Sequence, residues 1–193
     1  MKDTNPFLDD DAIEISKSAY MKFQSGENRF RALAKPVTGY EYWVDSKGEV
    51  QDSKTQRTKG ETYKPVRVRK GVVMTPDQGG NSKLFWALPV WNYKTEQVEV
   101  LEITQKKIQK DLAALVYSDE WGSPLGYDVI VIKEGEGLET KYNAIPTPHK
   151  SLTEEQKKAF AETPVNLDAL FTGGDPFLPI SEMDKEINDI LKS

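Results

Sequence analysis

Apolar and polar residues alternate along much of this chain with the two-residue period of a β-strand. The alternation starts in residues 20–34, where Arg29 and Arg31 share one face and Phe30 lies on the other. A second extended run, residues 40–44, follows after a proline and a glycine. The pattern therefore predicts a β-hairpin whose connection carries a Val-Thr-Gly segment.

The same alternation predicts further strands downstream, each bounded by glycine, proline or polar turn residues. In the run that starts at Val66, Arg67 and Arg69 share one face, which we expect to be exposed, with the valines on the core face. The last two runs predict a second hairpin that turns at two glycines. The predicted strands are 66–74, 82–93, 97–103, 127–135 and 138–146.

One long segment has the 3.6-residue period of an α-helix. In residues 104–117, the side chains of Ile108 and Leu112 lie on one apolar stripe. Thr104 is in position to cap the N-terminus of this helix. This is the main helix that the sequence predicts.

The C-terminal region predicts two shorter helices. Residues 151–160 contain a capping box, begun either by Ser151 or by Thr153 with the polar residue three positions later. Residues 180–193, after a segment rich in glycine and proline, predict an amphipathic acidic helix.

The order of these elements predicts a mainly β fold, because several strands precede one helix and two strands follow it. An OB-fold-like five-stranded barrel suits this order, although periodicity alone leaves an SH3-like or other small barrel open. We expect an acidic leader at 1–16 and the OB-fold nucleic-acid-binding domain at 17–150. Within that domain, residues 45–64 are nearly devoid of apolar side chains and predict a mobile basic loop. Residues 151–193 are expected to form an acidic helical tail.

Charge is distributed unevenly along the chain, whose formal net charge is −5. Residues 17–94 hold 15 Lys and Arg against 7 acids, whereas the leader, residues 95–150 and the tail are each acidic. A basic block between acidic segments indicates a polyanionic partner.

The sequence offers little for catalysis or for a metal. There is no cysteine, and the one histidine, His149, lies among prolines, so neither a zinc site nor a nucleophile with its base is expected. We therefore expect a binding protein without enzymatic activity or cofactor. No apolar run approaches the roughly 18 residues that span a bilayer, and the leader is acidic, which predicts a cytoplasmic protein with no membrane partner.

The basic block also carries most of the aromatic residues, and single-strand binding requires both cations and stacking surfaces. Because Trp86 and Trp91 differ in strand parity, at least one of them is expected in the core. Trp121, beside the end of the predicted helix, is also assigned to the core. The expected nucleic-acid-binding residues of this block are Arg29, Arg31, Lys35, Tyr40, Tyr42, Trp43, Lys59, Tyr63, Lys64, Arg67, Arg69, Lys70, Lys83, Trp86 and Trp91.

Two stretches resemble the single-stranded-DNA-binding, helix-destabilising proteins of large tailed phages. In residues 20–43 the resemblance rests on an opening Gly-Glu-Asn-Arg, and in residues 101–146 on Gly-Tyr-Asp followed by G-x-G-L-x-T-x-Y. It implies an OB-fold core that binds single strands with little sequence preference during DNA replication, recombination and repair in the host bacterial cytoplasm. The residues to which it points are Arg29, Arg31, Tyr40, Tyr42, Trp43, Lys141 and Tyr142.

The chain also departs from this family. The best-known relatives have a zinc subdomain, which a chain without cysteine lacks, and a basic N-terminal arm where this leader is acidic. The acidic C-terminus resembles tails that compete with DNA for the basic groove and recruit replication or recombination proteins. Self-association stays open.

Three other functions remain compatible with the sequence. The first is a protein–protein adaptor or inhibitor whose basic barrel face binds an acidic partner. The second is a nuclease accessory with an acid cluster formed only in space. The third is RNA binding, for which none of the usual RNA-binding modules is recognisable.

Overall fold

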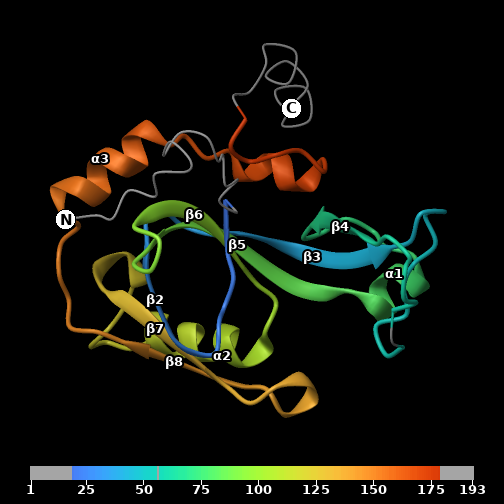
Figure 1. The fold of residues 1–193 in the computed structure, drawn as a ribbon, viewed down its shortest axis with the longest axis horizontal. Coiled ribbons are helices and arrows are strands. Elements are labelled where there is room, and N and C mark those ends of the chain that lie inside the picture. The colour runs from blue at the N-terminus through green and yellow to red at the C-terminus, as the bar shows by residue number, and fades with distance from the viewer. Residues whose placement is uncertain (1–18, 56, 179–193) are drawn as a thin grey trace, which may run out of the picture.

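The computed structural model describes residues 19–55 and 57–178, which form a mainly β fold with an eight-stranded mixed sheet and three α-helices (Figure 1). The strands are β1 (Tyr20–Met21), β2 (Gly26–Ala32), β3 (Val37–Val44), β4 (Lys64–Arg69), β5 (Lys83–Asn92), β6 (Gln97–Ile103), β7 (Asp128–Glu134) and β8 (Lys141–Pro146). The helices are α1 (Pro76–Asn81), α2 (Lys106–Val116) and α3 (Glu154–Glu162), with 3-10 turns η1 (Pro124–Gly126), η2 (Gly137–Glu139) and η3 (Leu167–Phe171).

Strand β5 is the central strand of the sheet. Strand β6 runs along one side of it, and β2 and β3 follow one another along the other side, so the order is β1-β6-β5-β2-β7-β8. At the other end of β5, strand β3 pairs with β5, and β4 pairs with β3. These two strands extend the sheet into a wing that also carries α1 (Figure 1). We use the term wing for β3, β4, α1 and the connecting loops.

The predicted hairpin of β2 and β3 is wrong, because these strands pair with β5 and not with each other. Ala32 lies opposite Val90 and Val37 opposite Ala87, so residues 33–36 form a bulge in one long, bent strand. Pro89 of β5 lies beside this bulge, accepts a hydrogen bond from the Leu33 amide and has no amide of its own to donate. The hydrogen-bond ladder between β5 and its bent partner is therefore interrupted at Pro89, where β5 has no amide to donate.

Gly39, which the sequence predicts in a turn, lies inside strand β3. A Cβ atom at this position would come within 2.4 Å of the Val68 carbonyl oxygen and 2.9 Å of the Phe85 and Phe171 rings. The glycine is needed because the backbone of β4 and two rings approach it closely.

The core inside the curved sheet is built by residues from β2, β5, β6, β7, β8 and α2, with Met21 of β1. Among the described residues the sheet is not closed, since β1 and β8, at the two ends of this strand order, do not pair with each other. The segment after β1 spans this opening: the Phe23 ring packs against Tyr142 of β8 with centroids 6.1 Å apart. Lys133 of β7 donates a hydrogen bond to the Phe23 carbonyl oxygen at 3.2 Å.

Helix α2 confirms the predicted main helix. Ile108 and Leu112 are buried, and Gln109 uses its amide to bond the carbonyl oxygens of Leu84 and Ile103. The helix begins at Lys106, so Gln105 and not Thr104 occupies the cap position, without a capping side-chain bond.

Much of the expected tail is a layer of the fold. Helix α3 begins with the capping box of Thr153 and Gln156, and η3 buries Leu167 and Leu170 against Phe85 and its neighbours on the sheet. Residues 1–18 and 179–193 lie outside the described residues, and so do the expected leader and acidic helix. None of the helices within 19–55 and 57–178 is long and apolar enough to cross a membrane.

The loop at 45–64 packs against β3 and α1 within the wing. The Ser53 amide donates a hydrogen bond to the side-chain oxygen of Asn81 at 2.8 Å, and Val44 and Val50 form an isolated β-bridge. The segment 76–81, predicted as a turn, forms α1 because Thr75 and Gln78 make a capping box.

An ion cluster with a buried carboxylate joins β2 to β7. Asp128 is fully buried and lies 2.5 Å from Arg29 and 3.0 Å from Arg31, whose side chain is 1 % exposed. Burial by itself would raise the pKa of the Asp128 carboxyl. Hydrogen bonds, the strongest of them from Arg29, outweigh this effect, and the pKa lies below its usual range.

Replacing Asp128 by Asn should destabilise the protein by about 3–5 kcal/mol near neutral pH, because the buried Arg31 loses its compensating charge. The pKa of Asp128 is lowered by folding, so its contribution is present above the unfolded-state pKa of about 4 and is lost as the pH falls through the folded-state pKa. Urea unfolding of both proteins across this pH range should show the difference shrinking in acid. Asp119→Asn, at an exposed position, is the control. Equal stability at pH 7 would contradict this role.

Candidate nucleic-acid interface

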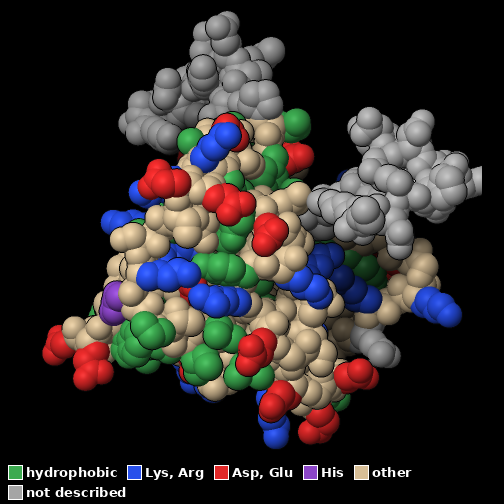
Figure 2. Space-filling view, turned by 60° about the vertical axis from the view of Figure 1, so that its left-hand side comes forward, with side chains coloured by type: hydrophobic (Ala, Val, Ile, Leu, Met, Phe, Trp, Pro, Cys, Tyr) green, Lys and Arg blue, Asp and Glu red, His purple; other side chains and the backbone are tan. Residues whose placement is uncertain are grey.

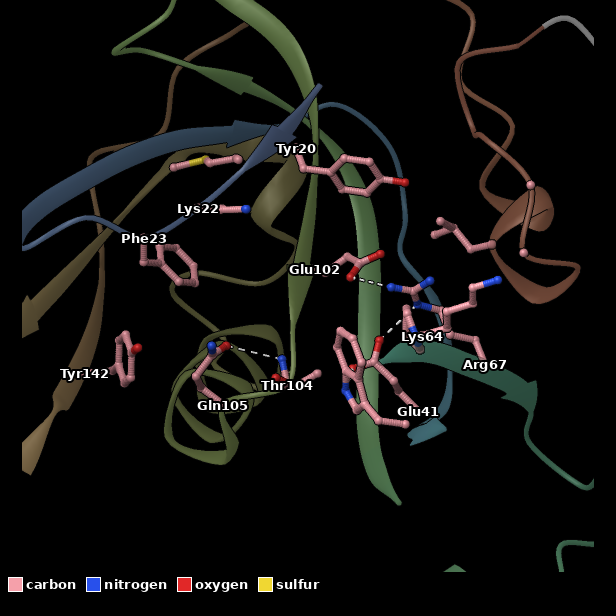
Figure 3. A pocket seen from close by; sticks show the side chains of 16 residues that line it. Tyr20, Lys22, Phe23, Glu41, Lys64, Arg67, Glu102, Thr104, Gln105 and Tyr142 are labelled. Atoms are coloured by element: carbon pink, nitrogen blue, oxygen red, sulfur yellow. Dashed lines mark hydrogen bonds and ion pairs between the residues drawn. The ribbon is translucent and has the colours of Figure 1, made fainter. Parts of the chain in front are cut away.

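A cleft of about 750 Å³ opens between the main sheet and the wing. One wall is the segment that begins with β1, together with β8, and the opposite wall is formed by β3 and β4 (Figure 3). The end of β6 and the start of α2 lie between them. The lining residues are Tyr20, Met21, Lys22, Phe23, Glu41, Trp43, Lys64, Pro65, Arg67, Glu102, Thr104, Gln105, Tyr142, Leu170, Gly173 and Gly174.

Aromatic side chains line both walls of the cleft. Phe23 and Tyr142 lie together on one side (Figure 3). Trp43 belongs to the opposite wall and donates its indole N–H to Glu41 at 3.2 Å. Rings on opposite walls suit flat, unpaired bases, because each base presents a face that stacks on an aromatic ring.

The loop at 45–64 covers part of Trp43. The Arg57 guanidinium lies 4.0 Å from the centroid of the Trp43 ring and 5.3 Å from that of Tyr63. The Tyr63 hydroxyl donates a hydrogen bond to the Glu61 carboxylate at 2.6 Å, which holds the Tyr63 ring in place. A cation over an indole face occupies a position similar to that of a stacked base.

The floor of the cleft is nearly balanced in charge. Arg67 lies 3.0 Å from Glu41 and 2.8 Å from Glu102, and its side chain is only 11 % exposed. Burial raises the pKa of the Glu41 carboxyl, an effect that Arg67 opposes and Glu102 reinforces. The two other lining cations, Lys22 and Lys64, do not pair with these carboxylates and leave the cleft with a small positive excess.

The expectation for strand β4 is wrong for Arg67, because this side chain is nearly buried between two glutamates. Arg67 is held between two glutamates, and Arg69 pairs with Asp168 of η3 at 2.7 Å and covers the Phe171 ring at 4.3 Å. Arg67 is thereby largely covered by β3 and β6, whereas the Arg69 side chain is 52 % exposed and faces solvent as expected. Val66 and Val68, assigned to the core, are half-buried.

Four of the expected residues line the cleft, namely Trp43, Lys64, Arg67 and Tyr142. Three others are buried and do not face solvent as expected, namely Arg31, Tyr42 and Trp91. Arg31 is buried in the ion cluster, and Trp91 packs in a second core beneath α3, while Trp86 is half-buried against the main core. Parity thus correctly placed at least one of these tryptophans in the core, and Trp121 also packs there.

The remaining expected residues lie outside the cleft lining. Arg29 and Arg69 form ion pairs, and Tyr40 and Tyr63 are half-buried on the wing. The exposed lysines are Lys35, Lys59, Lys70, Lys83 and Lys141.

Sequence reasoning missed several lining residues. Lys22 and Phe23 belong to the first alternating run, but a single Lys-Phe pair carried no signal beyond strand pattern. Gln105 enters the cleft at the helix start, where it was taken for an ordinary helix residue. A weak signal for Arg57 existed, since it is one of the basic residues in a loop with little apolar content.

Within the part of the chain that the structure describes, no group of three or more His, Asp or Glu side chains is placed to hold a metal ion. A scan against known protein families and searches of characterised proteins and of solved structures found no significant match.

Replacing Arg57 by Ala should increase quenching of tryptophan fluorescence by acrylamide, because the guanidinium no longer covers Trp43. The increase should be absent when Trp43 is also replaced by Phe. Lys54→Ala, in the same loop, is the matched control. Stability should change by less than about 1 kcal/mol, the usual size of an exposed cation–π contact. Unchanged quenching would show that Arg57 does not cover Trp43 in solution.

Proposed function

We propose that this protein binds single-stranded DNA in the cleft between the main sheet and the wing. The observation that carries the proposal is the combination of Trp43, Phe23 and Tyr142 on its walls with Lys22 and Lys64 among its lining residues. Stacking on such rings contributes about 1–3 kcal/mol per base and does not depend strongly on base identity. The expected ligand is thus a single strand of mixed sequence.

The strand order supports an OB-fold for this protein. If β2 with β3 is counted as the first strand, then β5, β6, β7 and β8 are the second to fifth, with α2 between the third and fourth. The first strand lies between the second and the fourth, and the fifth borders the fourth, as in OB-folds. The cleft is bordered by the third strand, the connection from first to second, and the fifth strand, close to the surface that OB-folds use for oligonucleotides.

The charges in the cleft favour one orientation of the strand. Glu41 and Glu102 on the floor repel a phosphate, while Arg67 is already paired with both. Phosphates therefore lie toward Lys22 and Lys64, and bases enter between the aromatic walls. Ion release from the phosphates makes the affinity fall as salt increases.

The role that we propose is that of the phage-type family to which the sequence is similar. The protein covers exposed single strands during replication, recombination and repair in the bacterial cytoplasm and has no catalytic step of its own. Partner proteins of these processes dock on the acidic C-terminus.

Titration with oligo(dT) should quench tryptophan fluorescence saturably and more weakly at high salt, because a base stacks on Trp43. Trp43→Phe should lose most of the quenching and several-fold in affinity. Trp86→Phe, which alters a half-buried tryptophan outside the cleft lining, should retain both.

Other outcomes of this titration separate the rival functions. No quenching and no shift of a labelled oligonucleotide at low salt would overturn the proposal and favour a protein adaptor. Tighter binding of oligo(U) than of oligo(dT) would point to RNA, and magnesium-dependent cleavage would point to a nuclease accessory.

Truncation after Leu178 should tighten oligo(dT) binding a few-fold at low salt and leave it unchanged at high salt. Residues 179–193 carry four acids against two lysines, and such an anionic segment competes with DNA for the cleft. The cut avoids Phe177, whose ring packs against Tyr20 of the cleft lining with centroids 6.5 Å apart. Unchanged affinity at low salt would limit the acidic segment to partner docking.

A further inference from the structure

The ion cluster of Asp128 contains more positive than negative charge. Arg29, Arg31 and Lys150 all lie within 3.6 Å of this single buried carboxylate. The Nε atom of Arg31 is buried and makes no hydrogen bond, while another of its nitrogens donates to the Lys150 carbonyl oxygen. Three cations around one carboxylate give the cluster a local excess of two positive charges, which attracts anions.

Two of these cations are open to solvent. The side chains of Arg29 and Lys150 are 41 % and 44 % exposed. Both approach the ring of Tyr93, at 4.5 Å and 5.6 Å from its centroid. They are thus held near each other on one face of the protein by a shared ring and a shared carboxylate.

An open groove of about 530 Å³ continues this face, and it is lined by Arg31, Lys150, Lys157 and His149 among others. Figure 2 shows Lys and Arg side chains gathered across the face, with the single His beside them. Lys157 also pairs with the exposed Glu154 at 2.7 Å. None of the groove's lining residues lines the cleft.

The groove also offers a stacking surface. The His149 ring lies parallel to that of Trp121, with centroids 5.6 Å apart and planes 14° apart, and its Nε2 is 3.0 Å from the Trp121 carbonyl oxygen. This contact fixes the ring, and His149 is an exposed residue. An exposed flat ring next to unbalanced cations favours a nucleic acid strand over an acidic peptide, which has no need of a stacking partner.

We propose that this groove is a second contact site for single-stranded nucleic acid, separate from the cleft. Phosphates bind at Arg29 and Lys150, Lys157 contacts the strand further along, and a base stacks on His149. The inference rests on the proposed function, since it describes where a strand too long for the cleft is bound.

Binding of a short and a long oligo(dT) tests this site, with about 4 and about 16 nucleotides as the range that one OB-fold covers. The double variant Lys150→Gln with Lys157→Gln should bind the short strand like the wild type. For the long strand its affinity should fall several-fold, and the slope of log affinity against log salt should shrink by about 1.4, or roughly 0.7 for each lost phosphate contact. Lys110→Gln with Lys158→Gln, at two exposed lysines outside the groove lining, is the matched control and should change neither.

The outcomes distinguish this inference from the proposed function. Normal binding of the long strand by the groove variant, or an equal loss for both strands, would overturn the second site while leaving the cleft in place. Failure of the wild type to bind either strand would overturn both. The second site would be supported if the wild type and the control variant bind the long strand more tightly than the short one and the groove variant does not.

Discussion

The whole molecule depends on the way in which one strand is shared. Strand β5 pairs with β6 along one side, and along the other it pairs first with β3 and then with β2. The bulge at residues 33–36 bends that second partner, so the same β5 belongs to the main sheet at one end and to the wing at the other. Main-chain hydrogen bonds are directional and obligatory in a buried sheet, so this arrangement fixes where the wing lies. The two walls of the cleft are thus parts of a single hydrogen-bonded sheet.

Two sets of paired charges join strands that lie far apart in the sequence. Arg67 joins β3, β4 and β6 through Glu41 and Glu102, and Asp128 joins β2 and β7 through Arg29 and Arg31. Both sets link distant strands, but they differ in balance. The floor of the cleft holds two carboxylates against one guanidinium, whereas the ion cluster of Asp128 holds one carboxylate against three cations. Under the proposed function, the first arrangement repels phosphates from a surface suited to bases, and the second attracts them.

The local elements of the fold could be predicted from the sequence, and the pairing between distant strands could not. Period alone located the main helix through Ile108 and Leu112 and the closing hairpin through its glycines. It could not show that β2 and β3 pair with one partner strand, because Pro36 suits a bulge as well as a turn, and Gly39 proved to lie inside a strand. Strand parity placed Arg67 and Arg69 on one face, but it could not indicate that Glu41 and Glu102 would cover Arg67 while Arg69 stayed exposed. Trp43 and Tyr142, expected as nucleic-acid contacts, do line the cleft. Arg31 and Trp91 are buried because their partners, Asp128 and α3, lie far along the chain, although parity had placed at least one of Trp86 and Trp91 in the core.

The absent side chain of Gly39 has a consequence for the ends of the chain. Strand β4, the Phe85 ring and the Phe171 ring all converge on this one position, where there is no room for a methyl group. The 3-10 turn η3, which carries Phe171, thereby packs closely against Gly39 of the wing. Because Phe177 then meets Tyr20, the described chain leaves the fold at the rim of the cleft, where it also enters. The absence of a Cβ atom at Gly39 thus lets Phe171 of η3 pack on the wing, and both ends of the described chain lie beside the cleft.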